Sequence, residues 1–164
     1  MPSLGETAAA VRVRPVIDDE ALLLGALHLQ ALRRRGAPAP AVRPGAPSHV
    51  QAFARSWQHR SADLPAWVGE ADGEHVGMAV CRAPLLPRVG SGVPALVLVE
   101  ALVKDGSRAE AVILALVRGV VAWAGREGYP AVDVAADVRL PTAVLDAARA
   151  DVLAHRRVSL PTRP

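Results

Sequence analysis

One stretch of the chain decides its fold, and over Leu96–Gly128 it reads LVLVEALVKDGSRAEAVILALVRGVVAWAGREG. Its beginning, Leu96–Val103, is apolar except for Glu100, which is the pattern of a strand covered on both faces. Over Ala109–Arg126 the apolar residues recur at helical spacing, and a glycine follows that can close a helix. The stretch therefore predicts a strand that leads through a short turn at Arg108 into a largely buried helix.

Short apolar runs on either side of this stretch indicate further strands. Val11–Ile17 alternates apolar with polar or small residues, and Pro15 restricts this run to a sheet edge or a strand end. Ala66–Ala71 and Glu74–Arg82 are joined by Asp72-Gly73, a pair that accepts the positive φ angles of a two-residue hairpin turn. Two later strands are expected at Ala131–Ala135 and His155–Leu160.

Capping signals delimit a first helix at about Asp19–Arg35. Asp18 can accept hydrogen bonds from the free amides at its start, and Gly36 can take the left-handed conformation at its end. The next stretch, Gly36–Pro47, holds four prolines among small residues, so it predicts an extended surface loop.

A second, short helix begins after this loop. Ser48 and Gln51 have the spacing of a capping box, and Val50, Phe53 and Trp57 share one face of a helix that runs to about Arg60. One more helix is expected at Pro141–Ala150.

Composition limits the class of protein. The 164 residues fit one domain over residues 11–164, preceded by a flexible tail over residues 1–10. The net charge of +3 is carried by scattered arginines with no aromatic interleaving, so no nucleic-acid partner is expected. Cys81 is the only cysteine, and no Cys/His cluster has metal-ligand spacing, so we expect no disulfide and no metal. Without a signal-like start or a membrane-length apolar run, we expect a cytoplasmic protein.

The order of these elements is strand, two helices, hairpin, long strand, helix, strand, helix, strand. This order resembles the GNAT superfamily of acyl-CoA-dependent N-acyltransferases. Trp67–Met78 looks like the second and third strands of that family, and Val121–Tyr129 looks like the end of its central helix. The resemblance covers Val11–Leu160. It implies an α/β (α+β) fold, a single domain whose mixed central sheet is flanked by helices.

The resemblance also implies a cofactor site. The family's strand-to-helix turn carries Arg or Gln, two residues, Gly, one residue, and Gly or Ala, and the matching stretch is Arg108-Ala109-Glu110-Ala111-Val112-Ile113. Backbone amides there would hold the pyrophosphate of acetyl-CoA or another acyl-CoA, and the amides of Leu102 and Val103 would polarise the thioester carbonyl.

This motif departs from the family's pattern. Arg108 is kept, but Ala111 and Ile113 stand at the glycine positions. Ala111 adds one methyl beside the same amide. Ile113 places a branched side chain where the family packs its helix against a strand or the cofactor, and Glu110 adds a negative charge nearby.

Glu100 is the candidate catalytic base, because a partly desolvated carboxylate can accept a proton from an incoming ammonium. The alternative is a glutamate that faces outward or pairs with an arginine. A tyrosine that often serves the family as general acid aligns with Ala147, and Tyr129, the only tyrosine, is a poor substitute. Trp57 could line an acceptor pocket or pack in the core.

Other reactive side chains have structural explanations. Trp67 could also line an acceptor pocket or pack in the core, and His75 beside the hairpin turn should be solvated. His28 has no carboxylate pattern around it, and Cys81 should be a small core residue.

Two functions remain open from the sequence. The first is an N-acetyltransferase that moves an acetyl or other acyl group from acyl-CoA to an amine on a small molecule or peptide. The second is a non-catalytic GNAT-like domain that has lost acetyl-CoA binding and acts as a binding or partner subunit. A homodimer or a partner protein fits either function, and no membrane association is expected.

Overall fold

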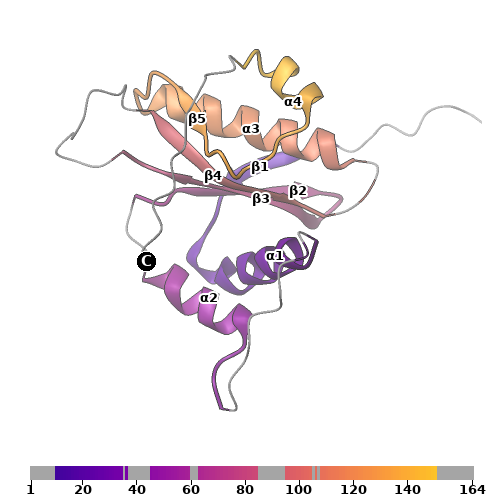
Figure 1. Ribbon diagram of the computed structural model, residues 1–164, viewed down its shortest axis with the longest axis vertical. Coiled ribbons are helices and arrows are strands. Elements are labelled where there is room, and N and C mark those ends of the chain that lie inside the picture. Colours follow the sequence, from indigo (N-terminus) through magenta and orange to yellow (C-terminus); the bar gives the residue numbers. More distant parts are fainter. Residues whose placement is uncertain are drawn as a thin grey trace, which may run out of the picture.

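The computed structural model describes residues 10–34, 36, 45–59, 63–84, 95–104, 106 and 108–150. They form a mixed α/β structure in which one sheet lies between two layers of helices (Figure 1). The strands are β1 (Arg12–Pro15), β2 (Ala66–Ala71), β3 (Glu74–Arg82), β4 (Leu96–Val103) and β5 (Val132–Val134). The helices are η1 (Asp18–Glu20), α1 (Ala21–Arg34), α2 (His49–Gln58), α3 (Ala109–Arg126) and α4 (Thr142–Ala147).

The element order matches the predicted order as far as α4. The predicted strand at His155–Leu160 lies outside the described residues, as do most of the predicted tail and of the loop at Gly36–Pro47. In the sheet the strands follow one another as β1-β2-β3-β4-β5. All pairs are antiparallel except β4 with β5, which is parallel with Leu96 opposite Val132. The predicted mixed sheet is confirmed.

Local turn chemistry is also confirmed. The hairpin between β2 and β3 turns at Asp72 and Gly73, whose φ angles are 53° and 77°. β1 is an edge strand that ends at Pro15, where the missing N–H costs no ladder bond.

The two helical layers cover separate cores. On one face α1 and α2 pack through Leu24, Leu27 and Trp57 against residues of β2, β3 and β4. On the other face α3 packs through Val112, Leu116 and Val120. Aliphatic side chains fill most of both cores, as the low aromatic content predicts.

The helix ends show one correction. The residue that caps the first helix is Ile17 rather than Asp18, and a 3-10 turn, η1, precedes α1. The backbone N–H of Ile17 donates to a carboxylate oxygen of Glu20 at 3.0 Å. At the C-terminal end Gly36 has φ 66°, as predicted, and its N–H donates to the carbonyl of Arg33 at 3.1 Å.

The capping box of α2 is confirmed in both directions. The N–H of Gln51 donates to Ser48 Oγ at 3.3 Å, and the N–H of Ser48 donates to Gln51 Oε1 at 3.0 Å. This cap fixes the start of the helix that carries Phe53 and Trp57.

Glycines on the strands let α3 approach the sheet closely. A Cβ added to Gly77 would lie 2.7 Å from the carbonyl oxygen of Leu102 and 3.0 Å from Val112 Cγ1. A Cβ added to Gly69 would contact Val112 at 3.6 Å. Val112, which is 3% exposed, therefore fills the contact between helix and strands. Ile113 is half-buried and is not among the described residues packed in this core.

Candidate active site

A β-bulge in β4 sets the direction of the candidate base. Cys81 lies opposite Leu98 and Val80 lies opposite Glu100, so Val99 is an extra residue in β4. Leu98 packs in the core under α3, whereas Leu102 packs in the core under α1 and α2. Because a bulge shifts the alternation by one residue, Glu100 shares the α1/α2 face of the sheet.

Glu100 lines a pocket of about 250 Å³ on this face. Its apolar lining consists of Phe53, Trp57, Leu64, Met78 and Val80, and its polar lining consists of His28, Ser56 and Glu100. Glu100 is half-buried on this face. The structure also brings His28 of α1 into this pocket, a juxtaposition with a carboxylate that no local pattern predicts.

Aromatic rings form a continuous column along the same pocket. His49, Phe53 and Trp57 succeed one another at one-turn spacing on α2, and the rings of Phe53 and Trp57 lie 6.0 Å apart and 8° from parallel. His28 joins from α1, with its ring centroid 5.3 Å from His49 and 5.1 Å from Phe53. His28 Nδ1 and His49 Nε2 are 3.2 Å apart, so one ring donates to the other. We call these four residues the aromatic column.

Trp57 both packs in the core and borders this pocket. Its side chain is 6% exposed and belongs to the core, yet it also lines the pocket. Trp67, in contrast, packs edge-on against Trp123 at 5.1 Å on the α3 face, away from this pocket.

Beyond the bulge, one edge of β4 is not paired with β5. The parallel pairing covers Leu96 to Leu98, and the last bond runs from the N–H of Ala135 to the carbonyl of Leu98 at 2.9 Å. β4 itself continues to Val103. Within the described residues, this edge thus leaves backbone groups beside the bulge that the sheet does not use.

The ladder to β3 determines which amides face that edge. The N–H of Lys104 donates to the carbonyl of Val76 at 2.8 Å, so by alternation the backbone groups of Leu102 face β3 and pair with Met78. The carbonyl of Val103 faces the opposite way and accepts from Arg34 Nη1. Of the two amides named from the sequence, Val103 is therefore the one on the open side, and Leu102 is engaged in the ladder.

A second pocket, of about 390 Å³, lies where α3 begins. Arg108 is the N-cap residue of α3, and its side chain makes no capping hydrogen bond to the helix. The N–H of Val112 donates to the carbonyl of Arg108 at 3.0 Å. The N–H of Ala109 bonds to the carbonyl of Gly106 at 3.1 Å. The N–H groups of Glu110 and Ala111 belong to the first turn, at the positive end of the helix dipole, but neither residue is in the described lining of this pocket.

Two ion pairs cross this second pocket from the β2–β3 hairpin. Arg108 Nη1 donates to Asp72 Oδ2 at 2.7 Å, and Lys104 Nζ donates to Glu74 Oε2 at 3.3 Å. All four side chains are exposed. The sequence places the negative charge of Glu110 near the expected phosphates, whereas the acids that contact Lys104 and Arg108 belong to the hairpin.

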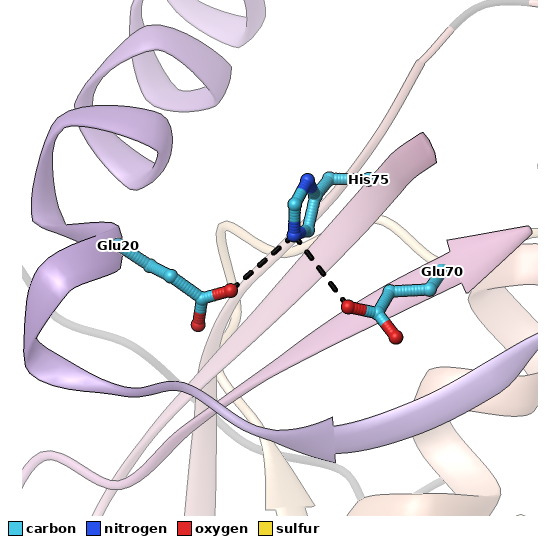
Figure 2. Close-up of side chains that lie close together, drawn as sticks. All are labelled: Glu20, Glu70 and His75. Atoms are coloured by element: carbon cyan, nitrogen blue, oxygen red, sulfur yellow. Dashed lines mark ion pairs between the residues drawn. The ribbon is translucent and has the colours of Figure 1, made fainter. Parts of the chain in front are cut away.

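A further charged cluster joins β1, η1 and the hairpin (Figure 2). His75 Nε2 lies 3.3 Å from Glu20 Oε1 and 3.5 Å from Glu70 Oε1, so His75 is not simply solvated as predicted. Arg14 donates from Nη2 to both of those oxygens, at 2.5 Å and 2.6 Å. Hydrogen bonding to Arg14 lowers the pKa of the Glu20 carboxyl to about 2, and the two carboxylates raise the pKa of Arg14.

The three side chains Glu20, Glu70 and His75 have the atom types of a metal site. The guanidinium of Arg14 already supplies positive charge to the same oxygens, so a cation would have to displace it. The cluster is therefore best described as an ion-pair network that ties the first strand to the hairpin.

The remaining named residues have structural positions. Cys81 is 0% exposed, and burial raises its pKa to about 12, which confirms the predicted core role. Tyr129 stacks on Trp123 with ring centroids 6.0 Å apart. Ala147 is exposed on α4.

Comparisons with known proteins place this fold. No family model and no curated protein matches the sequence. Among solved structures, an aminoglycoside N-acetyltransferase, AAC(6')-Iy in complex with CoA, superposes with a TM-score of 0.66 at 17% identity, covering 98% of this chain and 100% of that one. A ribosomal-protein-alanine N-acetyltransferase from Brucella melitensis biovar Abortus 2308 superposes with a TM-score of 0.64 at 17% identity, covering 93% of this chain and 99% of that one. An integron cassette protein from the mobile metagenome of Cole Harbour Salt Marsh superposes with a TM-score of 0.70 at 15% identity, covering 93% of this chain and 91% of that one.

The chain thus has the fold of the GNAT superfamily of N-acetyltransferases. At these identities the likeness establishes the fold alone. In the part of the chain that the structure describes, every helix is too short or too polar to cross a membrane.

Proposed function

We propose that the chain is an acyl-CoA-dependent N-acyltransferase that acts by direct transfer to an amine. The observation that carries this proposal is the bulge at Val99, which turns Glu100 into a pocket beside the unpaired edge of β4. The candidate base Glu100 and the amide of Val103 on the open side thus lie on one strand, and that strand borders the pocket. Two N-acetyltransferases with the same overall fold, one of them in complex with CoA, support the assignment.

The start of α3 fits the phosphate end of acyl-CoA. Glu110 and Ala111 belong to the first turn of α3, whose Arg108, Ala109 and Val112 line the second pocket, and Lys104 and Arg108 add two positive charges there. Ala111 is exposed, so its methyl does not close the site. The carboxylates of Asp72 and Glu74 oppose an anion there, and both must release their cations when phosphate binds.

Each residue then has a defined task. Acyl-CoA, when bound, supplies the acyl group as a thioester. Glu100 accepts a proton from the ammonium of the acceptor, and the free amine forms the new C–N bond while the C–S bond breaks. The N–H of Val103 faces the open edge, where it can donate to the carbonyl oxygen as negative charge develops on it. As the C–N bond forms, the nitrogen loses a second proton, which the departing thiolate takes up to give the thiol, and the first proton passes from Glu100 to solvent.

Two observations favour the non-catalytic alternative. The Arg108 guanidinium, which would contact the phosphates of the cofactor, already contacts the carboxylate of Asp72. Ala147 offers no acidic group that could protonate the departing thiolate. A binding domain that has lost the cofactor would keep this pair in all conditions.

An acylation assay tests the proposal. The chain is incubated with acetyl-CoA and a panel of primary amines, and free thiol and acetylated amine are measured together. We expect turnover that falls by about 10²- to 10⁴-fold in Glu100→Gln. Glu127→Gln, at the far end of α3, is the matched control and should keep full activity. Thiol release without acetylated amine, or equal rates in the two variants, would reject Glu100 as the base.

A further inference from the structure

The acceptor pocket has a lining that selects among amines. One carboxylate, Glu100, is the only acidic side chain in the described lining, and five of the eight lining residues are apolar. A polyamine or an amino sugar brings several cations or hydroxyls, and an apolar wall would strip their water without replacing those hydrogen bonds. A single ammonium on an apolar body meets no such penalty.

The aromatic column supports the same class of ligand. Phe53 and Trp57 present nearly parallel rings, and both line the pocket that holds Glu100. Ring faces attract a cation within about 6 Å of their centroids and also pack well against apolar or aromatic groups. A ligand with a cationic end and an apolar end therefore finds a complementary surface for each.

The size of the pocket limits the body of the ligand. Its volume of about 250 Å³ lies below the roughly 300–1,000 Å³ of pockets that enclose drug-sized ligands. The buried part of the acceptor is thus on the order of one ring or a short alkyl chain.

We infer that the acceptor is a small lipophilic monoamine, with its ammonium at Glu100 and its ring or alkyl body along Phe53 and Trp57. The assignment of this amine as an acceptor rests on the proposed function. The binding of this amine does not, because the described residues that line the pocket can contact it without any acyl-CoA.

Binding is measured by isothermal titration calorimetry without any acyl-CoA. The probes are 2-phenylethylamine, its neutral analogue 2-phenylethanol, the polycation spermidine and the peptide amide Phe-Ala-Ala-NH₂. We expect 2-phenylethylamine to bind at least about tenfold more tightly than each of the others. Glu100→Gln should remove most of the preference for the amine over the alcohol.

A variant that fills the pocket tests whether the amine binds there. Ser56 is exposed on α2 and lines the pocket, so Ser56→Leu should weaken 2-phenylethylamine at least about tenfold, as expected for a blocked pocket. Gln58→Leu adds a similar leucine at an exposed position of α2 outside the lining and should leave binding unchanged.

The outcomes separate the two proposals. Binding of the amine without turnover would reject the acyltransferase and keep the monoamine site. Turnover with spermidine or the peptide preferred over 2-phenylethylamine would reject the monoamine and keep the acyltransferase. Equal binding of 2-phenylethylamine by wild type and Ser56→Leu would also overturn the inference.

Discussion

Arg108 of the α3 N-terminus donates a hydrogen bond to Asp72 of the β2–β3 hairpin turn at 2.7 Å. This pair places a carboxylate against the cation that an incoming phosphate would use. Replacing Asp72 by Asn removes the competing charge and keeps the positive φ of 53°, which Asn tolerates.

We therefore expect Asp72→Asn to bind acetyl-CoA about 1.4- to fivefold more tightly, the range of an exposed ion pair worth about 0.2–1 kcal/mol. Titration calorimetry at low salt measures the change, and Glu127→Gln is the control for loss of one negative charge elsewhere. Unchanged affinity in Asp72→Asn would mean that the pair does not compete with the cofactor.

Gly77→Ala tests the close approach of α3 to the sheet. The added Cβ would meet the Leu102 carbonyl oxygen at 2.7 Å and Val112 at 3.0 Å, so the free energy of unfolding should fall by about 1–3 kcal/mol. Gly125→Ala meets nothing within 4 Å in the helix and should raise it by about 0.4–1 kcal/mol. Urea unfolding of both variants measures whether their free energies of unfolding change in opposite directions. An unchanged free energy of unfolding in Gly77→Ala would contradict the packing described for Val112.

Ser48→Ala tests the cap of α2, the helix that lines the proposed acceptor pocket. Loss of the bond to the Gln51 amide should lower the free energy of unfolding by about 1 kcal/mol. Ser48→Asp, which can cap the same amide, should remain within a few tenths of wild type. Thermal unfolding distinguishes them, and equal losses in both variants would argue against capping.

The Arg14–Glu20 pair predicts an acid-sensitive contribution to stability. The folded pKa of about 2 lies below the ordinary 4.5, so the contribution is fully present above pH 4.5 and is lost as the pH falls toward 2. Glu20→Gln should lower stability at pH 7 by roughly 1–3 kcal/mol, the range for hydrogen bonds to charged groups. Glu20→Gln should also flatten the dependence of the free energy of unfolding on pH between pH 4.5 and 2. Urea unfolding over this pH range measures the effect, with Glu127→Gln as the control. If stability falls with acid as steeply in Glu20→Gln as in the wild type, the Arg14–Glu20 pair is not its source.

Local signals in the sequence predicted most elements correctly. The Asp72-Gly73 turn, the Ser48–Gln51 box and the Gly36 cap depend on residues within one turn of each other, so their physics is contained in the local sequence. Asp18 was misassigned because Glu20, held by distant Arg14, supplies the carboxylate for the first helical turn.

The site depends on contacts that the local sequence does not contain. Strict alternation would set Glu100 on the same face as Leu98, and only the pairing with β3 introduces the bulge that reverses it. His28 reaches the pocket through the packing of α1, and Asp72 reaches Arg108 through the fold of the hairpin. Residue identities suggested the chemistry, whereas register and packing determined which groups meet.

Binding of acetyl-CoA at the start of α3 is the central claim, and thermal unfolding tests it most directly. At 100 times its dissociation constant, acetyl-CoA should stabilise the wild-type chain by about 2.7 kcal/mol, or roughly 5–10 °C for a domain of this size. Arg108→Ala should reduce the shift, and Ala111→Glu, at an exposed position of the first turn, should abolish it. No shift at millimolar acetyl-CoA, or a full shift in Ala111→Glu, would contradict the account.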